Sequence, residues 1–106
     1  MPITYFSLAI QDLYEIRTYL AINYPSIAQQ AGRKLRDNIN GLVPFPNLGK
    51  PGRVFGTREL VIPQVGKLSY ILIYGVQRES IQILRVLAGI RDIDTILGEG
   101  FEEDES

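Results

Sequence analysis

The amino-acid sequence predicts an α+β fold, in which an antiparallel two-helix hairpin packs on a mostly antiparallel meander sheet. Three observations predict it. Apolar residues recur at helical spacing over two adjacent stretches of the first half, β-rich runs separated by tight turns fill the second half, and a segment dense in proline and glycine divides the halves. Because helices and strands are segregated along the chain, the expected order is β-αα-βββ with a short C-terminal helix.

The chain is expected to begin with a short strand and a helix. Residues 2–6 are β-rich, which favours an edge strand. Ser7 is the expected N-cap of the first helix, which should end near Asn23 because the α region is disfavoured immediately before Pro25. Ala9, Leu13, Ile16 and Leu20 define its apolar face, and Asp12 is expected to lie elsewhere on the helix.

A second helix should follow after a loop of a few residues, so that the two form a hairpin. Ser26 is its expected cap. Its apolar positions are spaced by three or four residues: Ala28, Ala31, Leu35, Ile39 and Leu42.

The second half is expected to be a connector followed by three strands. The connector, residues 43–56, contains Pro and Gly at a density that excludes a regular element, with Leu48 or Phe45 expected to anchor it to the core. The strands are expected at 57–63, 67–77 and 80–88, with turns at 64–66 and 78–79 and a last helix at 91–97. Apolar residues on both faces of the last two strands indicate a sheet covered on both sides.

The composition excludes several classes of function. The chain of 106 residues has no cysteine and no histidine, which excludes disulfides, Cys/His zinc sites, thiol catalysis and Ser-His-Asp triads. The remaining carboxylates are scattered, and the pair Asp92 and Asp94 is weak support for a metal, so neither metal nor cofactor is expected. Neither a signal peptide nor a membrane span is indicated, so a soluble, cytoplasmic protein is expected.

The charge is distributed unevenly along the chain. Residues 99–106 hold five acids and no base, whereas the remaining chain carries 11 bases and 7 acids. This pattern predicts one domain over residues 1–98 and an acidic, disordered tail over residues 99–106.

A basic set is the main candidate for binding an acidic partner, because antiparallel pairing could bring its members near one sheet face and arginine suits phosphates and carboxylates. The set is Lys50, Arg53, Arg58, Arg85 and Arg91. The alternatives are an ion pair of Arg85 with Glu59 or Asp92, and plain solvent exposure of Arg53 and Arg58. Tyr70 and Tyr74 are either stacking platforms for bases or core residues with a hydroxyl at the rim.

The helical hairpin, the segment PGRVFGTREL, the strand YILIY and the closing ILRVLAGIRD together resemble the RelE/ParE superfamily. Its members are toxins of type II toxin–antitoxin systems, many of them plasmid stabilisation proteins. The resemblance covers roughly residues 3–97. It implies the RelE/ParE-like fold and a cognate antitoxin, encoded beside the toxin, that wraps it in a hetero-oligomer.

The resemblance implies one of two mechanisms. RelE-like members cut messenger RNA on the ribosome, whereas ParE-like members inhibit DNA gyrase and are not nucleases. Ile71 stands where the nucleases commonly have an arginine, Ala88 where many have a histidine, and the pI is about 5.4, low for a ribosome-binding nuclease. A ParE-like inhibitor of DNA gyrase, rather than an enzyme, is therefore the leading interpretation.

Two alternatives stay open. In a reduced ribosome-dependent endoribonuclease, the messenger phosphate would be held by Arg53, Arg58, Arg85 and Arg91, with Tyr70 or Tyr74 orienting a base. In a non-toxic homologue, the chain would only bind an antitoxin. The antitoxin is expected on the apolar meander and in the exposed groove of the hairpin, with these contact residues: Arg33, Lys34, Arg36, Tyr70 and Tyr74.

Overall fold

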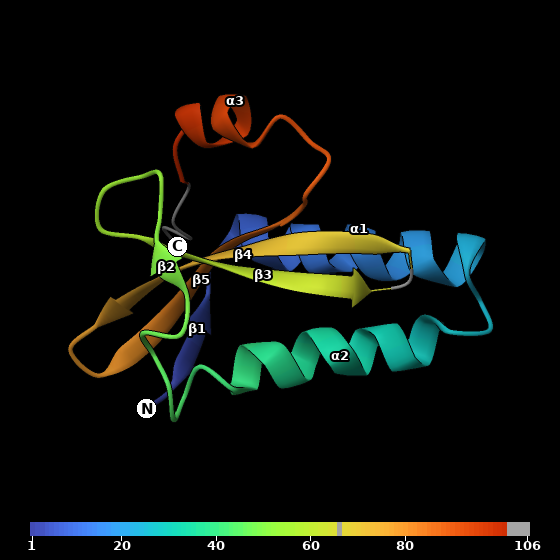
Figure 1. Ribbon diagram of the computed structural model, residues 1–106, viewed down its shortest axis with the longest axis horizontal. Helices are drawn as coiled ribbons and strands as arrows, with labels where there is room; N and C mark the ends of the chain where they lie inside the picture. Colours follow the sequence, from blue (N-terminus) through green and yellow to red (C-terminus); the bar gives the residue numbers. More distant parts are fainter. Residues whose placement is uncertain (66, 102–106) are drawn as a thin grey trace.

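In the computed structural model, which describes residues 1–65 and 67–101, five strands form one mixed sheet in the order β1-β5-β4-β3-β2 (Figure 1). The strands β3, β4 and β5 form the antiparallel meander that the sequence predicts, and β2 adds to it antiparallel. The strand β1 pairs with β5 in parallel. The strand bounds are β1 Ile3–Tyr5, β2 Lys50–Pro51, β3 Arg58–Val65, β4 Leu68–Gln77 and β5 Ser80–Ala88.

Helices lie on both sides of this sheet. The antiparallel pair α1 (Ser7–Asn23) and α2 (Ala28–Asn40) covers one face, and the short helix α3 (Ile93–Gly98) lies over the other (Figure 1). The α+β class and the order of elements are confirmed. No helix in the described part of the chain is long and apolar enough to cross a membrane.

The helix caps differ from the prediction. Phe6 is still extended and donates its N–H to the Ile83 carbonyl, so Ser7 is the first residue of α1 rather than its N-cap. The turn after Pro25 ends with Ile27 N–H donating to the Tyr24 carbonyl, and Ile27 rather than Ser26 occupies the N-cap position of α2. The cap of α1 therefore lies one residue earlier than predicted and the cap of α2 one residue later.

The strand β3 also runs further than predicted. It continues past Pro63 to Val65, with a register shift against β4 between Ile62 and Val65 and a positive φ of 59° at Gln64. Residues 64 and 65, expected in a turn, therefore belong to the strand. Gly66, the third residue of that expected turn, lies outside the described residues, as do residues 102–106 of the expected acidic tail.

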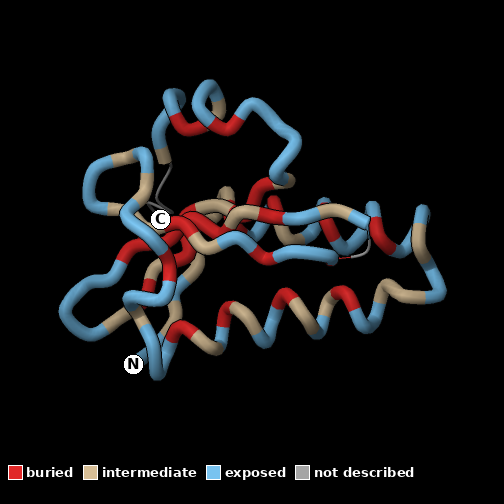
Figure 2. Tube along the Cα trace, in the orientation of Figure 1, coloured by how far each residue is buried: buried red, intermediate tan, exposed pale blue. Residues whose placement is uncertain are grey.

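Two buried clusters hold the layers together (Figure 2). The larger lies between the helical hairpin and the sheet, and it includes Leu20 and Ile39 from the helices and Leu72 and Ile83 from the strands. The smaller lies under α3 and consists of Ile73, Leu84, Leu87, Ile93 and Leu97, with Phe101 packed against it. The expectation that both sheet faces are covered is confirmed.

The connector is anchored by a hydroxyl rather than by its own apolar side chains. Phe45 and Leu48 are 64% and 56% exposed, so the expectation that either anchors this segment is wrong. Instead, the Tyr74 hydroxyl donates to the Pro46 carbonyl and accepts from the Gly49 N–H, both at 2.8 Å. The segment, expected to lack regular structure, also supplies the two-residue strand β2.

Candidate functional site

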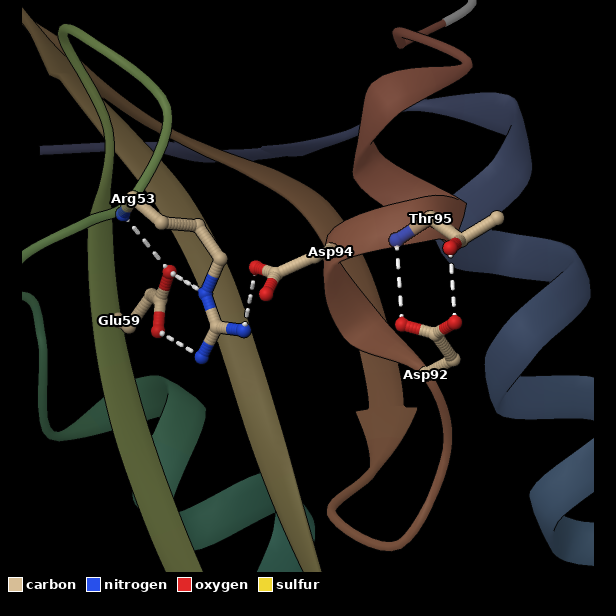
Figure 3. Close-up of polar contacts among 5 residues, drawn as sticks. All are labelled: Arg53, Glu59, Asp92, Asp94 and Thr95. Carbon is tan, nitrogen blue, oxygen red and sulfur yellow. Dashed lines mark hydrogen bonds and ion pairs between the residues drawn. The ribbon is translucent and has the colours of Figure 1, made fainter.

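Two arginines of the predicted basic set, Arg53 and Arg85, pair with carboxylates of the chain itself. The Arg53 guanidinium donates to both oxygens of the buried Glu59 carboxylate, at 2.9 and 3.0 Å, and the Arg53 backbone N–H donates to the same carboxylate at 2.9 Å (Figure 3). The remaining guanidinium nitrogen donates to Asp94 of α3 at 3.0 Å. Arg53 therefore joins the connector to β3 and α3, and its charge is already matched by two carboxylates.

Glu59 and Arg53 shift one another's pKa. Burial raises the pKa of Glu59, but the hydrogen bonds from Arg53 and the positive charges of Arg53 and Lys50 outweigh burial, so the pKa lies below its ordinary value. Hydrogen bonds to Glu59 and Asp94 raise the pKa of Arg53. Both groups remain ionised at neutral pH, as a structural ion pair requires.

Arg85 is held by a different residue from those predicted. Its Nε and Nη2 donate to the two oxygens of Asp12, at 2.8 and 2.9 Å, rather than to Glu59 or Asp92. The two side chains are 12% and 6% exposed. The expectation that Asp12 lies off the buried face of α1 is thus wrong. Its helical position puts it on the same face as Ala9 and Ile16, where Arg85 matches its charge. Arg85 is a structural residue, as the ion-pair alternative proposed.

The other three members of the basic set do not converge. Arg58 is partly buried and donates to the Gly49 carbonyl, whereas Lys50 and Arg91 are exposed. The strand register places Arg58 opposite Tyr74, whereas Ala88 lies opposite Tyr70, four residues away along β4. Four strand residues span about 13 Å. Arg91 follows Ala88 and so leaves the sheet at the far end from Arg58. The expectation that these cations meet on one sheet face is wrong.

The two tyrosines predicted to contact an antitoxin or a base are buried. Tyr70 is 2% exposed and Tyr74 is fully buried, both within the cluster beneath the helical hairpin. They are core residues, so in this structure neither offers a contact surface. Burial, with smaller contributions from Tyr19 and Tyr24, raises the pKa of Tyr70. A raised pKa keeps this hydroxyl protonated at neutral pH and makes it a weaker proton donor than an ordinary tyrosine.

The exposed groove expected on the helical hairpin is present between α1 and α2. It has a volume of about 470 Å³ and an apolar floor. Small residues at Ala21, Ala28 and Gly32 leave the helices open to each other, and a Cβ built at Gly32 meets no atom within 4 Å. One arginine from each helix, Arg17 and Arg36, lines the groove. The groove thus combines apolar surface with two positive charges.

The three cations predicted on α2 have different positions. Arg36 lines the groove, whereas Arg33 is exposed and is not among the lining residues. Lys34 turns toward the β3–β4 hairpin, where its Nζ donates to the Gln64 carbonyl at 3.4 Å. Arg17, which the sequence analysis did not single out, carries the second charge. Its position four residues after Leu13 and four before Ala21 is the signal that could have found it.

Three comparisons with known proteins agree with this fold. Residues 3–93 match the family model described as the ParE toxin of the type II toxin–antitoxin system parDE. "Putative toxin Y4kP" of Sinorhizobium fredii is 32% identical over 79 residues, which are 74% of this chain and 78% of that protein. A solved chain of the chromosomal ParDE toxin–antitoxin system from P. aeruginosa superposes with a TM-score of 0.69 at 24% identity, covering 83% of this chain and 95% of that chain, a likeness that shows the fold.

The family model spans most of the chain, and the relative passes 30% identity over about three quarters of it. The chain belongs to the ParE family of toxins from type II toxin–antitoxin systems.

Proposed function

We propose that this toxin arrests bacterial growth by binding DNA gyrase and that a cognate antitoxin neutralises it by occupying the groove between α1 and α2. The observation that carries the first part is the division of the basic set. Arg53 and Arg85 are each held by carboxylates. An inhibitor that works by binding needs no cluster of free cations around a phosphate.

A ribosome-dependent nuclease is the weaker hypothesis, because the basic residues do not converge on one point. Stabilising a phosphorane would require several cations aimed at one point. Arg58 and Arg91 leave opposite ends of the sheet, and Tyr70 is buried. Recruiting Arg53 or Arg85 to a phosphate would leave Glu59 or Asp12 as a buried carboxylate without its charge partner, which is strongly unfavourable.

The groove supports the second part of the proposal. An amphipathic helix that enters a groove between two helices inserts apolar side chains at intervals of three or four residues. The apolar floor suits such side chains, and Arg17 and Arg36 suit carboxylates on the flanks of the incoming helix. An antitoxin segment rich in apolar and acidic residues fits this surface.

Growth arrest and its cause are tested together by inducing the toxin in bacteria without antitoxin and following DNA and protein synthesis by label incorporation. We expect DNA synthesis to stop first, and the purified toxin to inhibit supercoiling by DNA gyrase. If protein synthesis stops first and DNA gyrase is unaffected, the gyrase proposal is wrong and the ribosome is the target instead. Normal growth with the toxin present would favour the non-toxic homologue.

The groove is tested with charge reversals in the co-expressed pair. The double variant Arg17→Glu with Arg36→Glu should reduce recovery of the antitoxin in a toxin pull-down by about tenfold or more. Arg33→Glu is the matched control, because it reverses a charge on the same helix outside the groove. If wild type, the double variant and Arg33→Glu all recover the antitoxin equally, the antitoxin binds outside the groove.

A further inference from the structure

We propose that Phe55, at the tip of the β2–β3 hairpin, is the residue that anchors the toxin to its target protein. The inference rests on the proposed function and adds the contact that the proposed function leaves open. It also commits to the chemistry of the partner, namely a protein surface with an apolar pocket bordered by carboxylates.

The hairpin that carries Phe55 is held firmly on both of its arms. The Gly52 N–H donates to the Thr57 carbonyl at 2.8 Å, and the Thr57 N–H and hydroxyl donate to the Val54 carbonyl at 3.1 and 2.7 Å. A Cβ at Gly52 would lie 2.4 Å from the Thr57 hydroxyl, so this close turn needs glycine. At the base, Arg53 is bound to Glu59 and Asp94 (Figure 3).

Within this fixed hairpin, neighbouring side chains have opposite environments. Val54 packs against the buried cluster beneath α3, whereas Phe55 is fully exposed. The hairpin projects from the end of the sheet beside α3 (Figure 1). Burying a phenylalanine side chain is worth about 1.5–3 kcal/mol, and because the loop backbone is already ordered, binding costs only the rotamer freedom of that side chain. These are the properties of an interface anchor.

The charge of the hairpin indicates the partner. Residues 38–58 contain no acidic residue, and they contain Lys50, Arg53 and Arg58. Lys50 is exposed, whereas Arg53 is neutralised and Arg58 is partly buried. Nucleic-acid binding depends on several cations that displace counterions from phosphates. One exposed lysine on the hairpin that carries an exposed aromatic ring fits an apolar pocket with a few carboxylates better than a phosphate backbone.

This anchor is separate from the groove proposed for the antitoxin. Neither Phe55 nor any other residue of the hairpin lines the groove between α1 and α2. The groove opens on the helical hairpin, whereas the β2–β3 hairpin is tied to α3, on the other side of the sheet. A substitution at Phe55 should therefore affect target binding and leave antitoxin binding intact.

The test compares Phe55→Ala with Ile22→Ala. Ile22 is also strongly exposed, at 72%, but it lies on α1, outside the groove between α1 and α2 and outside the β2–β3 hairpin. Circular dichroism and antitoxin pull-down establish that both variants fold. Growth arrest is measured at matched protein levels, and binding is measured with purified DNA gyrase. We expect Phe55→Ala to lose growth arrest and to bind gyrase about 30-fold or more weakly, whereas Ile22→Ala matches wild type. Phe55→Glu should weaken gyrase binding more than Phe55→Gln does. Glutamate and glutamine have the same shape, but the charge of glutamate repels the carboxylates expected on the partner.

The remaining outcomes separate this inference from the proposed function. If Phe55→Ala arrests growth as strongly as wild type, the anchor is wrong and the toxin assignment stands. If wild type arrests growth without binding gyrase, the gyrase assignment fails and the growth comparison alone decides Phe55. If the wild-type protein does not arrest growth, both the proposed function and the Phe55 anchor are wrong. If plasmid DNA or messenger RNA binds wild type but not Phe55→Ala, the partner is a nucleic acid and the inference is overturned.

Discussion

Asp12 of α1 accepts two hydrogen bonds from the Arg85 guanidinium and a third, at 2.9 Å, from the backbone N–H of Val86. The third bond has a topological cause. β1 pairs with β5 at Ile81–Ile83, after which the chain turns into α1. Beyond that point the edge of β5 has no strand beside it, and the carboxylate takes the place of the missing strand partner. One side chain thus fastens the first helix to the last strand.

Substituting Asp12 by asparagine should therefore destabilise the fold severely. The Arg85 charge would remain buried without its partner, which costs about 3–5 kcal/mol. Equilibrium unfolding in urea measures the loss. Asp37→Asn is the control, because Asp37 is an exposed carboxylate of α2 that is not among the charges acting on Arg85, and its substitution should change stability by less than about 0.5 kcal/mol. Equal urea midpoints for Asp12→Asn and wild type would show that this pair contributes nothing.

The ion pair of Glu59 with Arg53 predicts a specific pH dependence. The pKa of Glu59 lies below its ordinary value in the folded chain. The group therefore stabilises the fold above its unfolded pKa of about 4.3, and this contribution disappears as the pH falls through the lower folded value. Glu59→Gln should be less stable than wild type by about 1–3 kcal/mol at pH 7. The difference in urea midpoint between the two proteins should shrink as the pH falls from 5 to 3, and a constant difference would contradict the assignment.

Removing the Tyr74 hydroxyl should loosen the connector. Tyr74→Phe leaves the buried Gly49 N–H without its acceptor and the Pro46 carbonyl without its donor. A buried amide left without a partner costs about 1–3 kcal/mol. Thermal unfolding measures the loss, and amide hydrogen exchange at Gly49 should become faster. Tyr14→Phe provides the comparison, since Tyr14 is 68% exposed; similar behaviour of the two variants would remove Tyr74 as the anchor.

Much of the fold is visible in the sequence because its signals are local. The spacing of Ala31, Leu35 and Ile39 specifies the buried face of α2, and all three are buried in the structure. The alternation along residues 70–74 and 80–88 likewise predicts strands covered on both faces. These patterns require no knowledge of what lies across the fold.

The candidate site was harder to predict because its contacts join residues far apart in the chain. Asp12 and Arg85 are 73 residues apart, and Arg53 and Asp94 are 41 apart. The spacing of Asp12 from Ala9 and Ile16 is a local signal that this carboxylate faces the core, but nothing local identifies the arginine with which it pairs. Arg58 and Arg91 both flank strands, but whether they meet depends on strand register, which turns and bulges decide.

The groove between α1 and α2 yields a final prediction at Gly32. A Cβ built there meets no atom within 4 Å, and Gly32→Ala should stabilise α2 by about 0.5–1 kcal/mol, because glycine is a poor residue in a helix interior. The larger Gly32→Leu should still fold, but it would project into the space proposed for the antitoxin.

Gly32→Leu should therefore reduce antitoxin recovery by about tenfold or more while growth arrest by the toxin alone persists, since the target contact lies on the other hairpin. Gln30→Leu adds the same side chain at an exposed position of α2 outside the groove and should leave recovery unchanged. Pull-down from co-expressing cells and induction without antitoxin give the two readouts. Full antitoxin recovery by Gly32→Leu would exclude the groove as the antitoxin site, whereas loss of both activities with a normal fold would mean that target and antitoxin share it.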